Sequence, residues 1–161
     1  MHEMTISGVN FDIGAKQPIV MLKAKADNRY LAIWIGSTEA TAILMKLQGV
    51  ETPRPLTHDL LASVVGGLEA QVTRITVTEL REHTFFAVIT LRVRDAEVEV
   101  DSRPSDALAL AVRTNAPIFV ADAVLDENGF VVDEATATDS EEVVQAFKAF
   151  LEDVNPEDFA G

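Results

Sequence analysis

Two short polar segments hold most of the residues in this chain that could do chemistry. The first runs from Arg54 to Asp59 and reads Arg-Pro-Leu-Thr-His-Asp, and the second runs from Asp101 to Asp106 and reads Asp-Ser-Arg-Pro-Ser-Asp. Each places an arginine and a proline beside hydroxyl groups and carboxylates, just before an apolar run with helical spacing. A guanidinium binds phosphate through two parallel hydrogen bonds, and a carboxylate or a neutral imidazole can bind a metal ion or move a proton. The segments therefore indicate a polar site for a phosphate-bearing or otherwise anionic ligand.

The carboxylates and the histidine of these segments are the candidate catalytic groups. We expect a helix to begin at Thr57, and its positive end disfavours a protonated His58 while it stabilises the anion of Asp59. A neutral histidine beside a carboxylate suits a metal ligand or a general base. Asp101 ends a predicted strand, and together with Asp59 and Asp106 it could hold Mg²⁺ or Mn²⁺. Alternatively, the three carboxylates only stabilise the positive ends of helices, and some of them pair with Arg54 and Arg103.

The arginine and hydroxyl side chains are the candidate substrate-binding groups. Arg54 and Arg103 could clamp a phosphate, and they could equally bond loop carbonyls or pair with a neighbouring aspartate. Thr57 and Ser105 could contact the same ligand, although hydroxyl groups at helix starts most often cap the backbone. The chain has no Gly-x-Ser-x-Gly motif, no P-loop and no Gly-x-Gly-x-x-Gly fingerprint. The sequence therefore gives no support for a serine hydrolase of the nucleophile-elbow type, a P-loop or a Rossmann nucleotide site.

Charge and composition limit the classes of protein to which the chain can belong. The 161 residues suit one domain, and the absence of cysteine excludes disulfides, thiolate metal sites and a cysteine nucleophile. Residues 1–121 carry 12 basic and 14 acidic side chains, and residues 122–161 carry one basic and 12 acidic side chains, which gives the net charge of −13. Broad duplex binding requires many lysines and arginines, so a nucleic-acid substrate would need a local pocket. Without a signal peptide or a long apolar run, we expect a soluble, cytoplasmic protein.

The spacing of apolar residues predicts an α+β protein with a mixed, mostly antiparallel sheet and helices packed on it. A tight turn at Asp95 and Ala96 predicts a register that places Asp101 opposite Thr90. We expect a loop at residues 126–129. Strands are predicted at 3–13 with a bulge at Gly8, 18–25, 30–35, 72–80, 84–94, 96–101 and 118–120, and helices at about 37–48, 57–66 and 104–114.

The chain also contains a faint internal similarity. Three strands lead into the helical run Glu39–Leu44, and three more lead into Asp106–Ala111, so a duplicated β-β-β-α unit is possible. By this similarity Glu39 corresponds to Asp106 and is a fourth, weaker candidate metal ligand. We expect this α+β domain to span residues 1–132. An acidic linker and a C-terminal amphipathic helix are expected over 133–161, and the apolar stripe of that helix could pack in cis or form a homo-oligomer.

Residues 33–124 resemble the bifunctional nuclease family, small bacterial and plant domains credited with cleaving both RNA and DNA. The stretches that carry the resemblance are Trp34–Ala40, Arg54–Leu61, Thr84–Ala87, Asp101–Ala111 and Ala116–Val120. The resemblance implies a compact α+β domain and nuclease activity on a nucleic-acid substrate. It does not imply which residues are catalytic.

Our main hypothesis is metal-assisted hydrolysis of phosphodiesters. Asp59, Asp101 and Asp106 would hold or orient the ion, His58 would move a proton, and the arginines would stabilise the phosphorane charge. The first alternative is a non-enzymatic binding or regulatory module in which the two motifs are structural arginine–aspartate bridges. The second is a hydrolase or binder of small phosphorylated metabolites, which a narrow pocket would favour. Motifs that form buried mutual pairs would favour the binding module, and motifs that line an open cleft would favour an enzyme.

Overall fold

The structure is a computed structural model that describes residues 1–132 of the chain. The predicted linker and helix of residues 133–161 lie outside this range. The strands are β1 (His2–Asp12), β2 (Gln17–Ala24), β3 (Arg29–Trp34), β4 (Ala70–Arg81), β5 (Thr84–Val93), β6 (Ala96–Ser102), β7 (Ile118–Val120) and β8 (Phe130–Val131). The helices are α1 (Ser37–Leu47), α2 (Thr57–Gly67), α3 (Pro104–Thr114) and α4 (Asp122–Asn128). None of these helices is long and apolar enough to cross a bilayer.

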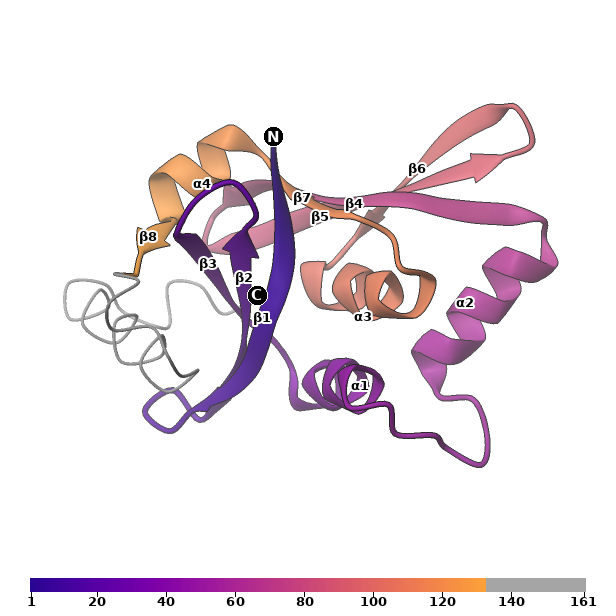
Figure 1. Cartoon of the computed structure of the whole chain (residues 1–161), viewed down its shortest axis with the longest axis horizontal. Coiled ribbons are helices and arrows are strands. Elements are labelled where there is room, and N and C mark those ends of the chain that lie inside the picture. Colours follow the sequence, from indigo (N-terminus) through magenta and orange to yellow (C-terminus); the bar gives the residue numbers. More distant parts are fainter. Residues whose placement is uncertain (133–161) are drawn as a thin grey trace.

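The eight strands form one sheet in the order β6-β5-β4-β7-β1-β2-β3-β8. Only β4 and β7 pair in parallel among these described strands, which confirms an α+β fold with a mixed, mostly antiparallel sheet. The meanders β1-β2-β3 and β4-β5-β6 lie on either side of β7, and each leads into a helix, α1 or α3. The chain therefore contains the β-β-β-α unit twice. Figure 1 shows the two meanders at a steep angle to each other, with α1 and α3 in the bend.

The core explains why α3 lies at the centre of the molecule. One face of the sheet contributes Val20, Leu22, Ile75 and Val77 to the main apolar cluster, and the buried run Ala107–Ala111 of α3 packs into it. A helix that is apolar on nearly every side must be enclosed. The start of α3, with Arg103 and Asp106, is thereby fixed at one edge of this core.

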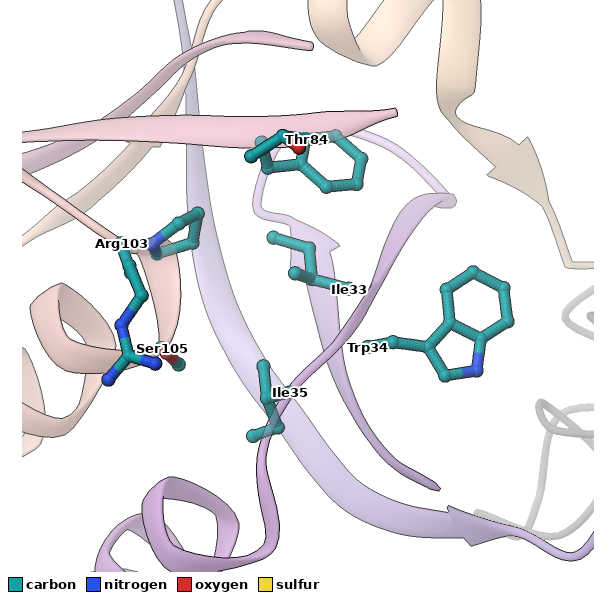
Figure 2. A pocket seen from close by; sticks show the side chains of 8 residues that line it. Ile33, Trp34, Ile35, Thr84, Arg103 and Ser105 are labelled. Carbon is teal, nitrogen blue, oxygen red and sulfur yellow. The ribbon is translucent and has the colours of Figure 1, made fainter. Parts of the chain in front are cut away.

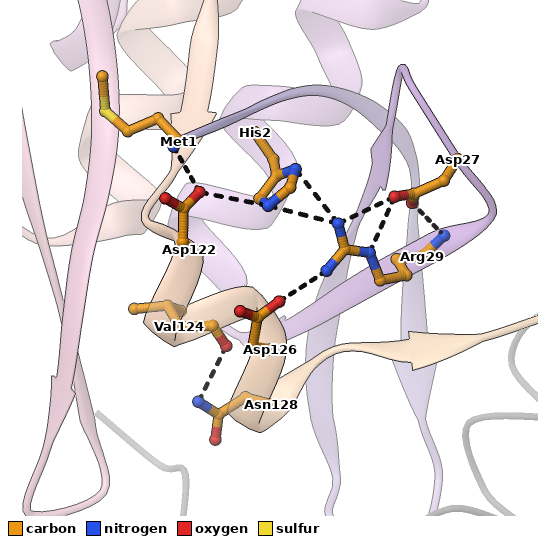
Figure 3. A network of polar contacts seen from close by, with 8 residues as sticks. All are labelled: Met1, His2, Asp27, Arg29, Asp122, Val124, Asp126 and Asn128. Atoms are coloured by element: carbon orange, nitrogen blue, oxygen red, sulfur yellow. Dashed lines mark hydrogen bonds and ion pairs between the residues drawn. The ribbon is translucent and has the colours of Figure 1, made fainter.

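A polar network holds α4 and the N-terminus against β3 (Figure 3). Arg29 of β3 donates to Asp126 of α4 at 2.8 Å, and its other amino nitrogen contacts the ring of His2. The N-terminal amine and His2 both contact Asp122 at the start of α4. The prediction of a loop at residues 126–129 was therefore wrong in part, because α4 extends to Asn128 and these contacts stabilise it. The sequence did not indicate this helix because the residues that stabilise it lie more than 90 positions away in the chain.

The predicted register of β5 and β6 was wrong by two residues. The turn contains Arg94 and Asp95 instead of Asp95 and Ala96, because Arg94 takes the left-handed conformation at φ 56°. Two-residue hairpins favour such positive φ angles, usually at glycine or asparagine, so the sequence did not indicate that arginine would take this position. Asp101 consequently lies opposite Val88. A shift of two residues keeps every side chain on its predicted face.

Other local predictions were close to the observed structure. The register of β1 and β2 shifts between Ile6 and Gly8, which confirms the bulge, and Gly49 follows α1 in the left-handed conformation at φ 68°. The three predicted helices begin at Ser37, Thr57 and Pro104, as expected. The residues at the N-cap are Gly36 for α1, Leu56 for α2 and Arg103 for α3, and none of them makes a side-chain capping bond.

Candidate active site

The first turns of α1, α2 and α3 line one groove with a volume of about 760 Å³. Both polar segments found in the sequence contribute to it, although 48 residues separate His58 from Asp106. The first backbone N–H groups of a helix lack partners within the helix and give this end a partial positive charge, so three helix starts favour an anion here. The lining residues are Ser37, Thr38, Glu39, Thr41, Ala42, Pro55, Leu56, Thr57, His58, Arg103 and Asp106.

His58 and Asp106 form a direct pair at the wall of this groove. Nε2 of the buried His58 lies 2.9 Å from Oδ1 of Asp106. Burial alone would raise the pKa of Asp106, but hydrogen bonds from Arg103 and His58 outweigh burial and lower that pKa. An ionised Asp106 accepts a hydrogen bond from Nε2 of His58, so a neutral imidazole here would have its free lone pair on Nδ1. A carboxylate that orients a neutral imidazole in this way prepares it to accept a proton.

Arg103 joins the starts of α1 and α3. Its Nε lies 2.8 Å from Oδ2 of Asp106, and its Nη2 lies 3.0 Å from Oε1 of Glu39. The hydrogen bond to Asp106 and, after it, the bond to Glu39 raise the pKa of Arg103. The arginine side chain is 63% exposed whereas that of Glu39 is 16% exposed, so the guanidinium faces the solvent from above two more buried carboxylates. Glu39, the weakest of the candidates from the sequence, therefore belongs to the site.

Asp59 has a different role from that of its neighbour His58. It pairs with Arg113 of α3, whose Nε lies 2.6 Å from Oδ1, and its other oxygen accepts the backbone N–H of Leu56 at 2.9 Å. The Leu56 bond and then the Arg113 bond lower the pKa of Asp59. The Arg113 side chain is 5% exposed and also donates to the carbonyl oxygens of Ala42 and Ala109. This pair therefore joins α1, α2 and α3.

Sequence reasoning missed Arg113. It is a single arginine in the last turn of an apolar helix, where a basic residue most often interacts with the helix dipole. Its partners Asp59 and Ala42 lie 54 and 71 residues away in the chain.

The other predicted residues occupy separate places. Thr57 lies in the groove, and the exposed Arg54 precedes Pro55 at its rim. Ser105 is buried and lines a smaller cavity of about 80 Å³, which shares Arg103 with the groove (Figure 2). Asp101 is exposed on β6 and does not line either space.

The carboxylates predicted to hold a metal ion do not form one cluster. Within residues 1–132 no three histidine, aspartate or glutamate side chains gather as a metal site would require. Asp59 is engaged with Arg113, and Asp101 stands apart on β6. Glu39 and Asp106 are both in the groove, with Arg103 between them. Mg²⁺ often takes only one or two protein carboxylates when water and substrate phosphates complete its coordination shell. Glu39 and Asp106 would suit such an ion if a substrate phosphate supplied further ligands.

The comparison with protein families decides which family this is. The model of the bifunctional nuclease domain matches residues 20–133, most of the chain. The chain belongs to the bifunctional nuclease domain family. The matched range contains α1, α2 and α3, and with them every residue of the groove.

Individual relatives agree with this assignment. A protein of Mycobacterium tuberculosis that is described only as uncharacterized is 39% identical over 164 residues, which cover 99% of this chain and 98% of that protein. Bifunctional nuclease 1 of rice, Oryza sativa, is 24% identical over 132 residues. The rice alignment covers 80% of this chain and 40% of the plant protein, so the plant protein contains much sequence beyond the shared domain.

Proposed function

We propose that this protein is a nuclease that hydrolyses phosphodiester bonds of RNA or DNA in the groove at the three helix starts. Membership of the bifunctional nuclease domain family supports the reaction class. The observation that supports the proposal is the chain of contacts from His58 through Asp106 and Arg103 to Glu39, which brings an imidazole and a guanidinium together at one open groove.

The proton-transfer step falls to His58. With Nε2 bonded to Asp106, its Nδ1 would accept a proton from a water molecule or a ribose 2′-hydroxyl as that oxygen attacks phosphorus. The ionised Asp106 would stabilise the imidazolium that results. The burial of His58 strengthens this interaction, because the effective dielectric constant around a buried group is lower than in bulk water.

Phosphate binding would come from the helix starts, Arg103 and Arg54. Arg103 has two carboxylate partners in the groove, so it can stabilise the phosphorane only through its remaining N–H groups or after exchanging a partner. Arg54 is exposed, and within the described residues its side chain has no hydrogen-bond or ion-pair partner, so it is free to contact a flanking phosphate. Thr57 would add a hydroxyl donor from the first turn of α2.

A divalent ion remains part of the proposal. The groove contains two carboxylates and one arginine, a combination that does not by itself attract a polyanion. Mg²⁺ or Mn²⁺ bound by Glu39 and Asp106 would supply positive charge to the phosphate oxygens. Cleavage in excess EDTA would show that this ion is not required.

The test is cleavage of end-labelled single-stranded RNA and DNA with Mg²⁺, Mn²⁺ or EDTA. His58→Ala and Asp106→Asn should reduce the rate constant by at least about 100-fold, the order of magnitude of general acid–base catalysis. Asp101→Asn is the matched control, because its exposed carboxylate lies outside the groove, and it should retain full activity. Loss of activity in the control, or full activity in folded His58→Ala, would contradict the site.

One observation favours a second function, a non-enzymatic binding or regulatory module. Asp59, which is partly exposed, forms an ion pair with the buried side chain of Arg113, and the hypothesis of structural bridges expected such a pair in this motif, although with a different arginine. Arg103 and Asp106 instead line an open groove, as the enzyme hypothesis expected. Saturable binding of oligonucleotides without cleavage under every metal condition would favour the module. Cleavage confined to mononucleotide esters would favour a small phosphorylated substrate.

A further inference from the structure

Strands β2 and β3 are buried on both of their faces. Every residue of Pro18–Leu22 and of Tyr30–Trp34 is buried. Near-continuous apolar runs of this kind are typical of strands with a covering layer on each side. Successive side chains of a strand point to opposite faces, and Figure 2 shows Trp34 pointing away from the side that carries Ile33 and Ile35. These strands therefore need two covering layers.

The described residues cover only one of the two faces. Val20 and Leu31 lie on the face that packs in the main apolar cluster, together with buried residues of α1, α3 and α4. The opposite face forms a second apolar cluster, to which no helix within residues 1–132 contributes. The buried members of this second cluster are Ile19, Met21, Tyr30, Ala32, Trp34, Phe130 and Val132, with Ala15 of the β1–β2 turn packed at its margin.

The second cluster is buried by the chain itself. Each of its buried members is at most 6% exposed in a single copy of the chain. Neither a second copy nor another protein is therefore needed to remove these side chains from water. Val132, the last residue that the structure describes, belongs to this cluster and donates its N–H to the carbonyl oxygen of Asn28. Residues 133–161 thus begin on the face whose cover the described residues do not supply.

The sequence of the C-terminal segment has the pattern that such a cover requires. In the helix expected from Ser140, at about 100° per residue, an arc of about 120° contains the apolar residues Val143, Val144, Phe147, Phe150 and Leu151. The opposite side of the same helix contains the acidic residues Glu141, Glu142, Glu152 and Asp153. One apolar side and one acidic side suit a helix that covers a sheet and faces water with its other side.

The length of the apolar stripe matches the face of the strands. Eight helical steps from Val143 to Leu151 rise about 12 Å, and four strand steps from Ile19 to Lys23 extend about 13 Å. Only β3 lies between β8 and β2 in the sheet, so the connection from Val132 to Val143 has to cross about two strand spacings, or about 10 Å. Eleven residue steps reach at least about 36 Å when extended, which is more than sufficient.

We propose that residues 140–151 of this chain dock in cis as a helix on the second apolar cluster, with Phe147 and Phe150 against β2 and β3. The ammonium group of Lys23, 5.6 Å from the centre of the Tyr30 ring, lies where acidic residues beside the stripe can attract it. Docking in cis occupies the stripe and leaves it unavailable for a homo-oligomer. It also supports β3, which leads directly into α1 and thereby into Glu39 of the groove.

The first test uses Trp34, the single tryptophan of the chain, as a reporter within the second cluster. Phe147→Glu with Phe150→Glu should shift the emission of Trp34 to longer wavelength and increase its quenching by acrylamide, because water then reaches the indole. Gln145→Glu with Ala149→Glu is the matched control, since it adds the same charge on the opposite side of the helix and should leave both quantities unchanged. Circular dichroism checks that each variant is folded. Equal shifts in the two variants, or no shift in folded Phe147→Glu with Phe150→Glu, would overturn the proposal.

A second test leaves the apolar stripe intact and uses the absence of cysteine from the chain. A dansyl group on Gln145→Cys should accept excitation energy from Trp34, and the transfer should persist on dilution to concentrations at which analytical ultracentrifugation shows a monomer. The same label on Asp95→Cys, in the exposed β5–β6 turn, should accept much less, because six strand spacings of about 4.8 Å separate β6 from β3.

Two outcomes of this second test would contradict docking in cis. One is transfer to Gln145→Cys that is no stronger than transfer to Asp95→Cys. The other is transfer that disappears when the chain is monomeric, because a second copy would then supply the cover. Neither fluorescence measurement depends on nuclease activity.

Discussion

Nε of Arg113 lies 2.6 Å from Oδ1 of Asp59, and this contact joins the last turn of α3 to the first turn of α2. One residue before Asp59, His58 contacts Asp106 at the start of α3. Ala62 and Val65 of α2 pack against the main apolar cluster, and the two polar contacts add to this packing at the N-terminus of the helix. The position of the candidate base therefore depends in part on an ion pair outside the groove.

Removing either partner of this pair should destabilise the fold, but unequally. Asp59→Ala leaves the buried guanidinium of Arg113 without its anion and should lower the free energy of unfolding by about 3 kcal/mol. Arg113→Met removes the buried charge and leaves a carboxylate that is 32% exposed, so we expect a loss of about 1–2 kcal/mol. Urea denaturation with a common m-value measures both.

The double variant tests whether the two effects share one contact. Asp59→Ala with Arg113→Met should cost less than the sum of the single changes by at least about 1 kcal/mol, because the interaction is lost only once. Additive effects would show that the pair does not couple α2 to α3. In this case the position of His58 would not depend on it.

Acid should weaken the fold through Asp59 and Asp106. The pKa of each is lower in the folded protein than its ordinary value, so their contribution to stability is complete above about pH 4–5 and is lost as the pH falls through the folded pKa values. Asp59→Asn should reduce the slope of unfolding free energy against pH between about pH 5 and 3. Asp101→Asn, at an exposed position, should retain the wild-type slope.

Gly36→Ala should displace Glu39 without unfolding the protein. A Cβ at Gly36 would clash with Oε2 of Glu39, the flexible end of a side chain, and the φ of −69° suits alanine. Glu39 must then move away from Arg103, so nuclease activity should fall about tenfold while stability changes by less than about 1 kcal/mol.

Two further variants show whether this effect passes through Glu39. In a protein that already carries Glu39→Ala, Gly36→Ala should have no additional effect on activity, because the carboxylate of Glu39 is no longer there to be displaced. Gly66→Ala in α2 is the control, since its Cβ would meet no atom within 4 Å. A loss of activity in Gly66→Ala similar to that in Gly36→Ala would contradict this explanation.

Arg54 should affect substrate binding rather than the chemical step. Arg54→Ala should raise KM for an oligonucleotide about three- to tenfold with kcat unchanged, and it should reduce the dependence of log affinity on log salt concentration by about one unit. Arg94→Ala, at an exposed arginine in the β5–β6 turn, should change neither quantity. An unchanged KM in Arg54→Ala would exclude a phosphate contact at this position.

Local sequence patterns were sufficient to predict most of the elements. Apolar residues alternate around Ile75 and Val77 with the two-residue period of a strand, and those of α3 recur at helical spacing. Such a pattern can be recognised within a few residues of sequence. The internal similarity between Glu39 and Asp106 also corresponds to two real β-β-β-α units, whose helices begin at the same groove. The two polar motifs were recognisable because their residue types are unusual before helices.

The sequence by itself therefore determined the elements and drew attention to the residues of the groove. Only the tertiary structure decided how those residues pair: Asp59 with Arg113, Asp106 with His58 and Arg103, and Glu39 with Arg103. Except for the local contact between Arg103 and Asp106, these pairs join residues 48 to 64 positions apart. Their contacts depend on how α1, α2 and α3 pack against one another, and no period or spacing in the chain records that packing.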